Sequence, residues 1–246
     1  MDSDRKLTKA QKRELRKQEW QQKAEADKKQ EQFKKIAIWV GAALVMILAI
    51  AGLAFLVNSS PTSSSQPINV APVSDKDITN GVKDSKVTLM EYADFQCPAC
   101  ASYQPILKQI LAEYDGKILF VFRNYPLTSI HKNAVISAQA GYAAHKQGGF
   151  FEMAESLYDN QKNWESLGDP RPEFIDYAKE LKMDINKFEQ DMNAGETKNF
   201  VKDSERQAIS EGMNSTPTFV LNGVKIKSPN NSEAFKRLID DELNKE

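Results

Sequence analysis

The residues best suited to chemistry are the two cysteines of the chain, Cys97 and Cys100, in the segment FQCPAC. The apolar residues 87–95 before them predict a buried strand, and a helical pattern begins at Pro98. A helix N-terminus carries roughly +0.5 of a charge and unpaired N–H groups, which favour a thiolate over a thiol. We therefore expect Cys97 to be an exposed nucleophile. We expect Cys100, one turn inside the helix, to be a buried resolving thiol.

Three other roles compete with redox activity for this pair. A structural disulfide across two residues closes almost no loop, so it would stabilise the fold little. A zinc site needs four ligands. The two histidines, His131 and His145, are separated by thirteen residues, which does not match finger spacing, so no metal site is predicted. Two inert buried thiols are the third alternative. Redox activity is favoured, with the Cys97–Cys100 disulfide as the redox group and no bound cofactor.

A second motif, Ser215-Thr216-Pro217-Thr218, lies just before a predicted strand. A proline at a strand start offers no N–H to the sheet, and an X–Pro bond adopts the cis form at low cost. Downstream of a C-x-x-C motif on a strand–helix–strand unit, this favours a cis Thr216–Pro217 bond. Between the cysteines, Pro98 at the first helical position costs no hydrogen bond and fixes φ.

Glu91 lies six residues before Cys97 in a mostly apolar strand. One interpretation makes it a buried proton acceptor for Cys100, with its pKa raised by loss of hydration. The other makes it a solvated carboxylate at the edge of the sheet. The sequence leaves both open.

The elements around these motifs predict an α/β fold. After the first strand and helix, residues 117–123 form a second strand, which suggests a parallel crossover. Residues 131–212 show helical patterns and no strand. Residues 218–221 and 224–227 flank Asn222-Gly223 and predict a hairpin, followed by a final helix. The order is βαβ, an inserted helical block over about 131–212, then ββα.

Charge divides the chain into three parts. Residues 1–35 hold 12 Lys/Arg against 7 Asp/Glu, residues 36–57 hold none of either, and residues 58–246 hold 21 against 27. The overall composition excludes a wholly disordered chain, a collagen-like fibre and a disulfide-stapled miniprotein. The net charge of −1 argues against a nucleic-acid partner.

The 22 uncharged residues 36–57 predict one transmembrane helix, because a helix of that length is roughly 33 Å long and a bilayer core about 30 Å thick. A buried core helix and a cleaved signal peptide are the alternatives. The lysines just before the segment place the tail 1–35 in the cytoplasm. Residues 58–74 read as a flexible linker. Residues 75–246 then form one extracytoplasmic domain.

The outer domain resembles the DsbA-like disulfide oxidoreductases of the thioredoxin fold. The resemblance covers roughly residues 75–246 and rests on VTLMEYADFQCPAC, on Thr216-Pro217 before TFVLNG, and on the helical block between them. It implies that Cys97 attacks and Cys100 resolves mixed disulfides.

The same resemblance implies roles for four further residues. Pro217 would be a cis-proline facing the disulfide, and Thr216 would offer backbone groups to an extended substrate. Glu91 matches the family's buried acidic residue. His131 matches a position that opens the first inserted helix, where N-capping or packing is favoured over catalysis. Ala99 departs from the family, because strongly oxidising members often carry a histidine there.

The sequence therefore predicts a thiol–disulfide oxidoreductase tethered to a bacterial cell membrane by residues 36–57, with its catalytic domain outside. We expect it to form disulfides in exported proteins that carry reduced cysteines, and to need a membrane partner for reoxidation. A reductase or isomerase of the same fold is one alternative. A tethered binding module or holdase without enzymatic activity is the other.

Overall fold

The computed structural model describes residue 46 and residues 66–245. The described residues 66–245 belong to one compact unit, which contains the cysteine pair. The predicted tail 1–35, the predicted membrane helix 36–57 apart from Met46, and linker residues 58–65 lie outside the described residues. Within the described part, no helix has both the length and the apolar composition needed to cross a membrane.

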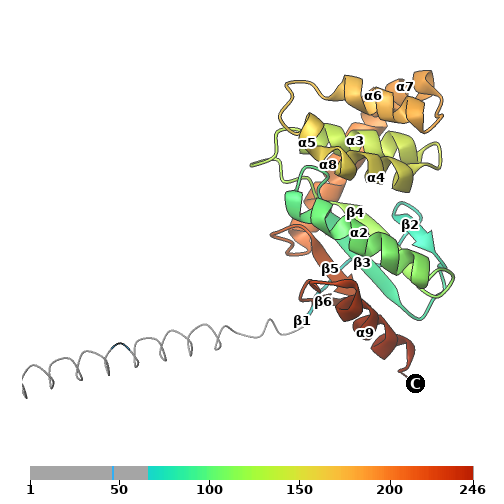
Figure 1. The fold of residues 1–246 in the computed structure, drawn as a ribbon, viewed down its shortest axis with the longest axis vertical. Coiled ribbons are helices and arrows are strands. Elements are labelled where there is room, and N and C mark those ends of the chain that lie inside the picture. Colours follow the sequence, from blue (N-terminus) through green and yellow to red (C-terminus); the bar gives the residue numbers. More distant parts are fainter. Residues whose placement is uncertain (1–45, 47–65, 246) are drawn as a thin grey trace, which may run out of the picture. The chain divides into compact units, whose positions relative to one another are not determined.

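Within residues 66–245, six strands form one sheet in the order β1-β6-β5-β3-β4-β2 (Figure 1). Strands β3 and β4 are parallel, and the other neighbouring pairs are antiparallel. The strands are β1 (Gln66–Pro67), β2 (Ile78–Gly81), β3 (Thr88–Ala93), β4 (Leu119–Asn124), β5 (Thr218–Leu221) and β6 (Val224–Ile226). The predicted strand–helix–strand crossover and the C-terminal hairpin are both confirmed. Strands β1 and β2 were not predicted.

Helices account for most of the remaining described chain. They are α2 (Pro98–Glu113), α3 (Ala134–His145), α4 (Phe150–Asp159), α5 (Gln161–Trp164), α6 (Arg171–Glu180), α7 (Ile185–Asn193), α8 (Gly195–Ser210) and α9 (Ser232–Leu243). Helices α3 to α8 form the predicted inserted block, although α4 and α5 were not recognised as separate helices. Asp184 caps α7, because its carboxylate accepts a hydrogen bond from Lys187 N at 3.0 Å.

The two faces of the sheet bury different apolar clusters, as strand alternation requires. Leu89 and Phe219 belong to the larger cluster, which also includes Leu107 of α2 and Phe235 of α9. Met90 and Val220 belong to the smaller cluster on the other face, together with Ala208 of α8. The larger cluster continues into the helical block, so the sheet and the insertion share one core.

Residues 66–77 form an ordered strap across the domain, where the sequence placed a linker reaching Ser74. Strand β1 pairs with β6 at one edge of the sheet, and β2 begins at the other edge. Between them, Arg123 Nη2 donates to the carbonyl oxygen of Ala71 at 2.9 Å, and Ala71 N donates to Glu211 at 2.7 Å. Buried charges on the domain thus hold the strap, and a composition rich in small polar residues gives no sign of such distant partners.

Candidate active site

Strand β3 and helix α2 place Cys97 at the junction between them. Cys97 is the N-cap of α2 and Pro98 is its first residue, as predicted. The Cys97 N–H donates to the carbonyl oxygen of Asp94 at 3.0 Å, and its own carbonyl accepts from Ala101 N at 3.2 Å. The two neighbours Pro98 and Ala99 are exposed. The local sequence thus builds the helix N-terminus that thiolate chemistry requires.

Cys97 is more covered than the sequence predicted, with 6% of its surface exposed. Its Sγ lies 3.5 Å from the carbonyl oxygen of Thr216, to which the thiol donates a hydrogen bond. The Thr216–Pro217 bond is cis, which confirms that prediction. The segment before β5 therefore contacts Cys97 and helps to cover it.

The two thiols have opposite acidities. The pKa of Cys97 is lowered to about 5, first by a hydrogen bond from the Cys100 thiol, then by contributions from Thr216 and from the N–H groups of Cys100 and Ala99, which together outweigh burial. The pKa of Cys100 is raised, mainly by burial, and 1% of Cys100 is exposed. At neutral pH the reduced pair therefore holds one thiolate, on Cys97, and one thiol, on Cys100.

Thr216 has a hydroxyl group that suits this thiolate. Its Oγ1 is buried without a hydrogen-bond partner among the described residues. A buried hydroxyl without a partner is costly, and a negatively charged sulfur is a better acceptor than a thiol. Ionisation of Cys97 thus offers the Thr216 hydroxyl the acceptor that it lacks.

Glu91 lies inside the sheet and not at its edge. Strand β3 has β4 on one side and β5 on the other, and Glu91 pairs in register with Phe122 and Phe219. It is 2% exposed, and burial raises its pKa to about 8, with a further contribution from the charge on Cys97. The interpretation as a solvated strand-edge carboxylate is therefore wrong. A carboxyl with this pKa is mostly protonated at pH 7.

Sequence reasoning missed Tyr158, which lies beside the same cavity as Glu91. The cavity has a volume of about 190 Å³, and both residues line it. The Tyr158 ring packs on Phe95 with 5.1 Å between centroids, and its hydroxyl is buried without a partner among the described residues. Burial raises the pKa of Tyr158, and charges on Cys100 and Glu91 add to the effect. Helix α4 therefore contributes to the surroundings of the cysteines.

Asp94 was also missed, although its position three residues before Cys97 is a possible signal. Its carboxylate is fully buried and accepts hydrogen bonds from Gln96 N at 2.8 Å and Leu127 N at 2.9 Å. The Nδ1 atom of His131 lies 2.7 Å from the same carboxylate. Asp94 is therefore the point at which the cysteine loop meets the inserted block.

The histidines have no part in a metal cluster within the described residues. His131 contacts Asp94, and the N-cap of α3 is Asn133, so the predicted capping role of His131 is wrong. His145 ends α3 and stacks on Tyr142 at 5.6 Å, and burial lowers its pKa. Neither histidine completes a zinc site with the cysteines.

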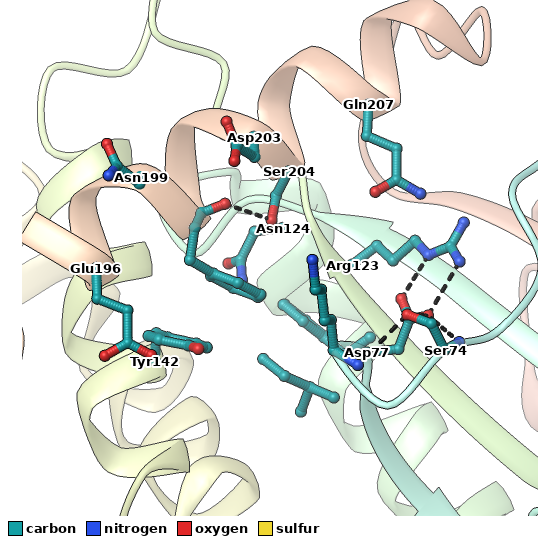
Figure 2. Close-up of a pocket in the computed structure, with 14 residues that line it drawn as sticks. Ser74, Asp77, Arg123, Asn124, Tyr142, Glu196, Asn199, Asp203, Ser204 and Gln207 are labelled. Atoms are coloured by element: carbon teal, nitrogen blue, oxygen red, sulfur yellow. Dashed lines mark hydrogen bonds and ion pairs between the residues drawn. The ribbon is translucent and has the colours of Figure 1, made fainter.

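A separate cavity of about 480 Å³ lies between the strap, the end of β4, and helices α3 and α8 (Figure 2). Arg123 and Asp77 form an ion pair along its wall, with Nε and Oδ1 2.8 Å apart. Asn124 also lines it, and the Nδ2 atom of Asn124 is buried without a partner among the described residues. Neither cysteine lines this cavity, so it is distinct from the candidate active site.

Comparison with known proteins shows which family and which fold the chain has. A thioredoxin family profile matches residues 73–241, and the chain belongs to the thioredoxin family. The solved structure of BdbD from Bacillus subtilis is 22% identical, covers 73% of this chain and 100% of its own, and has a TM-score of 0.64. The α-DsbA1 of Wolbachia pipientis is 21% identical, covers 70% and 92%, and has a TM-score of 0.62. These similarities establish a thioredoxin fold like that of DsbA for residues 73–241.

The curated relatives that this chain matches are named as sodium/proton antiporters. The Na(+)/H(+) antiporter NhaA 1 of Mycolicibacterium vanbaalenii is 32% identical over 168 residues, which are 68% of this chain and 26% of that protein. The antiporter NhaA 3 of Salinispora tropica is 32% identical over 170 residues, or 67% and 24%. The chain thus spans about a quarter of the length of these relatives.

The fold and its cysteine pair support thiol–disulfide oxidoreductase activity in general.

Proposed function

We propose that the chain is a membrane-tethered, extracytoplasmic oxidoreductase that forms disulfides in exported proteins by exchange at Cys97 and Cys100. The observation that carries this proposal is the asymmetry of the two thiols. A Cys97 pKa of about 5 means that the reduced pair is stabilised as a thiolate at neutral pH. A stabilised reduced form makes the disulfide a stronger oxidant. Oxidation of substrates is therefore the favoured direction.

The exchange proceeds through two attacks. A substrate thiolate attacks Cys97 Sγ of the oxidised pair, the Sγ–Sγ bond breaks, and its electrons leave on Cys100. A second substrate thiolate then attacks the substrate sulfur of the mixed disulfide, and Cys97 leaves as a thiolate. Two electrons have passed from the substrate to the pair. Of the two protons that the substrate thiols lose, Cys100 keeps one and solvent receives the other.

Glu91 donates a proton to Cys100 as it leaves and regains one of the two protons that the substrate thiols lose. Its pKa of about 8 keeps it protonated at pH 7, and its charge interaction with Cys100 contributes to the raised pKa of that thiol. A positioned acid of this kind contributes about 10²-fold or more to a rate. Glu91→Gln should therefore slow the formation of the mixed disulfide at pH 7. Glu155→Gln, which changes an exposed carboxylate at the same cavity, is the matched control.

Thr216 and Pro217 bind the substrate in this proposal. The carbonyl oxygen of Thr216 lies 3.5 Å from Cys97 Sγ, so it lies within reach of any chain attached to that sulfur. Backbone groups at this position bind any extended peptide irrespective of its side chains. This suits an enzyme whose substrates are many exported proteins with reduced cysteines.

The tether and its orientation complete the proposal. Residues 36–57 anchor the chain in the bilayer with residues 1–35 in the cytoplasm, and a membrane partner reoxidises the pair. Ala99 leaves the thiolate without a side-chain partner from the intervening dipeptide, so Cys100, Thr216 and backbone N–H groups carry the stabilisation. A membrane-impermeant maleimide should label the cysteines of intact, reduced cells if the domain is outside. Labelling confined to lysed cells would contradict this topology.

The decisive test is oxidation of a reduced model protein by the purified full-length chain. Cys97→Ser should abolish the activity, and Cys100→Ser should trap mixed disulfides. Equilibration with glutathione then gives the direction. A potential below about −230 mV, towards thioredoxin's roughly −270 mV, would indicate a reductase. Full activity after loss of both cysteines, in an assay of substrate aggregation, would indicate a holdase.

A further inference from the structure

The Asp94 backbone contacts the cysteine motif. Its carbonyl oxygen accepts the Cys97 N–H at 3.0 Å, and Cys97 is the N-cap of α2, the helix that contains Cys100. The position of Asp94 therefore restrains the start of the helix that carries both cysteines. An interaction that holds Asp94 in place also restrains the redox pair.

The Asp94 side chain is fixed by the loop that enters the helical block. Its Oδ1 accepts Gln96 N at 2.8 Å, while its Oδ2 accepts Leu127 N at 2.9 Å and lies 2.7 Å from His131 Nδ1. The side chain is 0% exposed, and His131 is 16% exposed. The carboxylate cannot accept from bulk water, so these three donors must hold it.

His131 provides the one side-chain donor among these contacts, and its Nδ1 atom makes the shortest of them at 2.7 Å. It is also the one ionisable partner that Asp94 has within the described residues. The loop is preorganised for this contact, because His131 N donates to the Leu127 carbonyl at 2.9 Å. The imidazole therefore contacts Asp94 from the turn Leu127–His131, and the first residue of that turn donates its own N–H to the same carboxylate.

We infer that His131 is a positioning residue for the redox pair, acting through Asp94 to hold Cys97 and Cys100 in the geometry that stabilises the reduced form. The inference rests on the proposed function, because it concerns the same thiol–disulfide site. It assigns the inserted helical block a part in setting the redox equilibrium. Loss of the His131 donor leaves a buried carboxylate short of one partner, and the cheapest relief is a shift of residues 94–97 towards water.

A second set of contacts ties the same loop to the block without any charge. Gln161 Nε2 donates to the Phe95 carbonyl at 2.7 Å, and Gln96 Oε1 accepts Asn133 N at 2.6 Å. These contacts keep the chain folded when the His131 contact is removed. The effect of a His131 substitution is therefore expected at the sulfurs and not as global unfolding.

Three substitutions at His131 distinguish loss of its hydrogen-bond donor from a change in side-chain volume. His131→Leu keeps the volume and removes the donor. In His131→Asn the side-chain amide takes the place of Nδ1 and keeps the donor, whereas His131→Gln places its amide one bond further away. Thr128→Ala is the control, since it removes a hydrogen bond to Glu205 from the same loop without touching Asp94.

The measurements are the Cys97 pKa, from thiolate absorbance, and the equilibrium constant with glutathione, both on the purified full-length chain. His131→Leu should raise the Cys97 pKa by one unit or more and make the pair at least tenfold less oxidising. His131→Asn and Thr128→Ala should match the wild type, and His131→Gln should lie between. If His131→Leu does not fold, the difference between the Asn and Gln variants decides.

A folded Leu variant with wild-type pKa and equilibrium would overturn the inference, as would Asn and Leu variants that behave alike. Equal behaviour of the Asn and Gln variants would do the same where the Leu variant is unfolded. These outcomes are independent of the proposed function. A wild-type chain that fails to oxidise substrates defeats the oxidase assignment, yet the variants still report whether His131 sets the equilibrium.

Discussion

The Sγ atom of Cys97 lies 3.5 Å from the carbonyl oxygen of Thr216, although 119 positions separate the two residues in the sequence. This contact joins the N-terminus of α2 to the cis peptide before β5, and it covers a sulfur that the sequence alone suggested would be exposed. A substrate must displace or share this contact to reach the sulfur. Cys97 therefore lies between two backbone segments, the N-terminus of α2 and the segment before β5.

Titration of the reduced chain should show Cys97 ionising with a midpoint of about 5. Cys100→Ala should raise this midpoint, because the hydrogen bond from the Cys100 thiol is the largest cause of the lowered pKa. The midpoint should stay below 9, since the Ala99 and Thr216 contributions remain. Alkylation by iodoacetamide between pH 3 and 10 measures it. Ionisation near 8.5, as for an ordinary free cysteine, would contradict the proposed stabilisation.

Glu91 should make the reduced protein less stable as the pH rises. Its folded pKa of about 8 lies above its unfolded value near 4.5, so the unfolded chain releases the proton first. The stability that the neutral form confers is complete below pH 4.5 and declines until about pH 8. The loss is about 3 kcal/mol at pH 7.

Urea unfolding of wild type and Glu91→Gln at pH 4.5, 6, 7 and 8 tests this expectation. The free energy of unfolding of the wild type should fall relative to that of the variant across this range, because the glutamine side chain of the variant does not titrate and stays neutral throughout. A constant difference between the two proteins would mean that Glu91 ionises at its ordinary pKa.

Local patterns explain why much of the site was predictable. The strand before Cys97 and the proline at the start of α2 express preferences of a few neighbouring residues. The cis bond before Pro217 was predicted instead from its place downstream of the C-x-x-C motif, since an X–Pro bond adopts the cis form at low cost. The central strands were equally visible, since β3 and β4 are buried along nearly their whole length. The membrane segment 36–57 stays a prediction, because it lies outside the described residues apart from Met46.

Long-range pairings explain what was missed. Asp94 and His131 are 37 positions apart, and the sequence around each residue does not indicate that the two will be in contact. Strand β2 reads ITNG, which is short, polar and ended by a glycine, so it lacks the apolar run of the central strands. The burial of Glu91 depends on strands β4 and β5 on either side of it, and sequence alternation does not reveal which strands become neighbours.

Gly81 should tolerate no side chain. It has φ of +103°, and an added Cβ would lie 2.2 Å from the carbonyl oxygen of Ile118. Gly116 also has positive φ, +69°, but its Cβ would meet open space. Gly116→Ala should therefore cost about 1 kcal/mol from backbone strain alone, and Gly81→Ala about 3 kcal/mol or more, because the strand pairing must shift as well. Equal losses of unfolding free energy in the two variants would contradict this account.

Arg123 should be the residue on which the strap depends. Its side chain is 6% exposed, and it donates to Asp77 at 2.8 Å and to the carbonyl oxygen of Ala71 at 2.9 Å, with Glu211 3.4 Å away. Arg123→Met keeps much of the volume but leaves two nearly buried carboxylates without their cation. Removal of one partner from a buried ion pair costs about 3–5 kcal/mol.

Two measurements on Arg123→Met follow from this geometry. The free energy of unfolding should fall by about 3 kcal/mol or more, and limited proteolysis should cut within residues 68–77 before the rest of the domain is attacked. Lys179→Met is the control, because it breaks the exposed pair with Asp176 and should cost less than about 1 kcal/mol. If the two variants lose similar stability and the strap resists protease in both, Arg123 does not hold it. The pairing of β1 with β6 and the hydrogen bond from Ala71 N to Glu211 would then fix residues 66–77 to the domain.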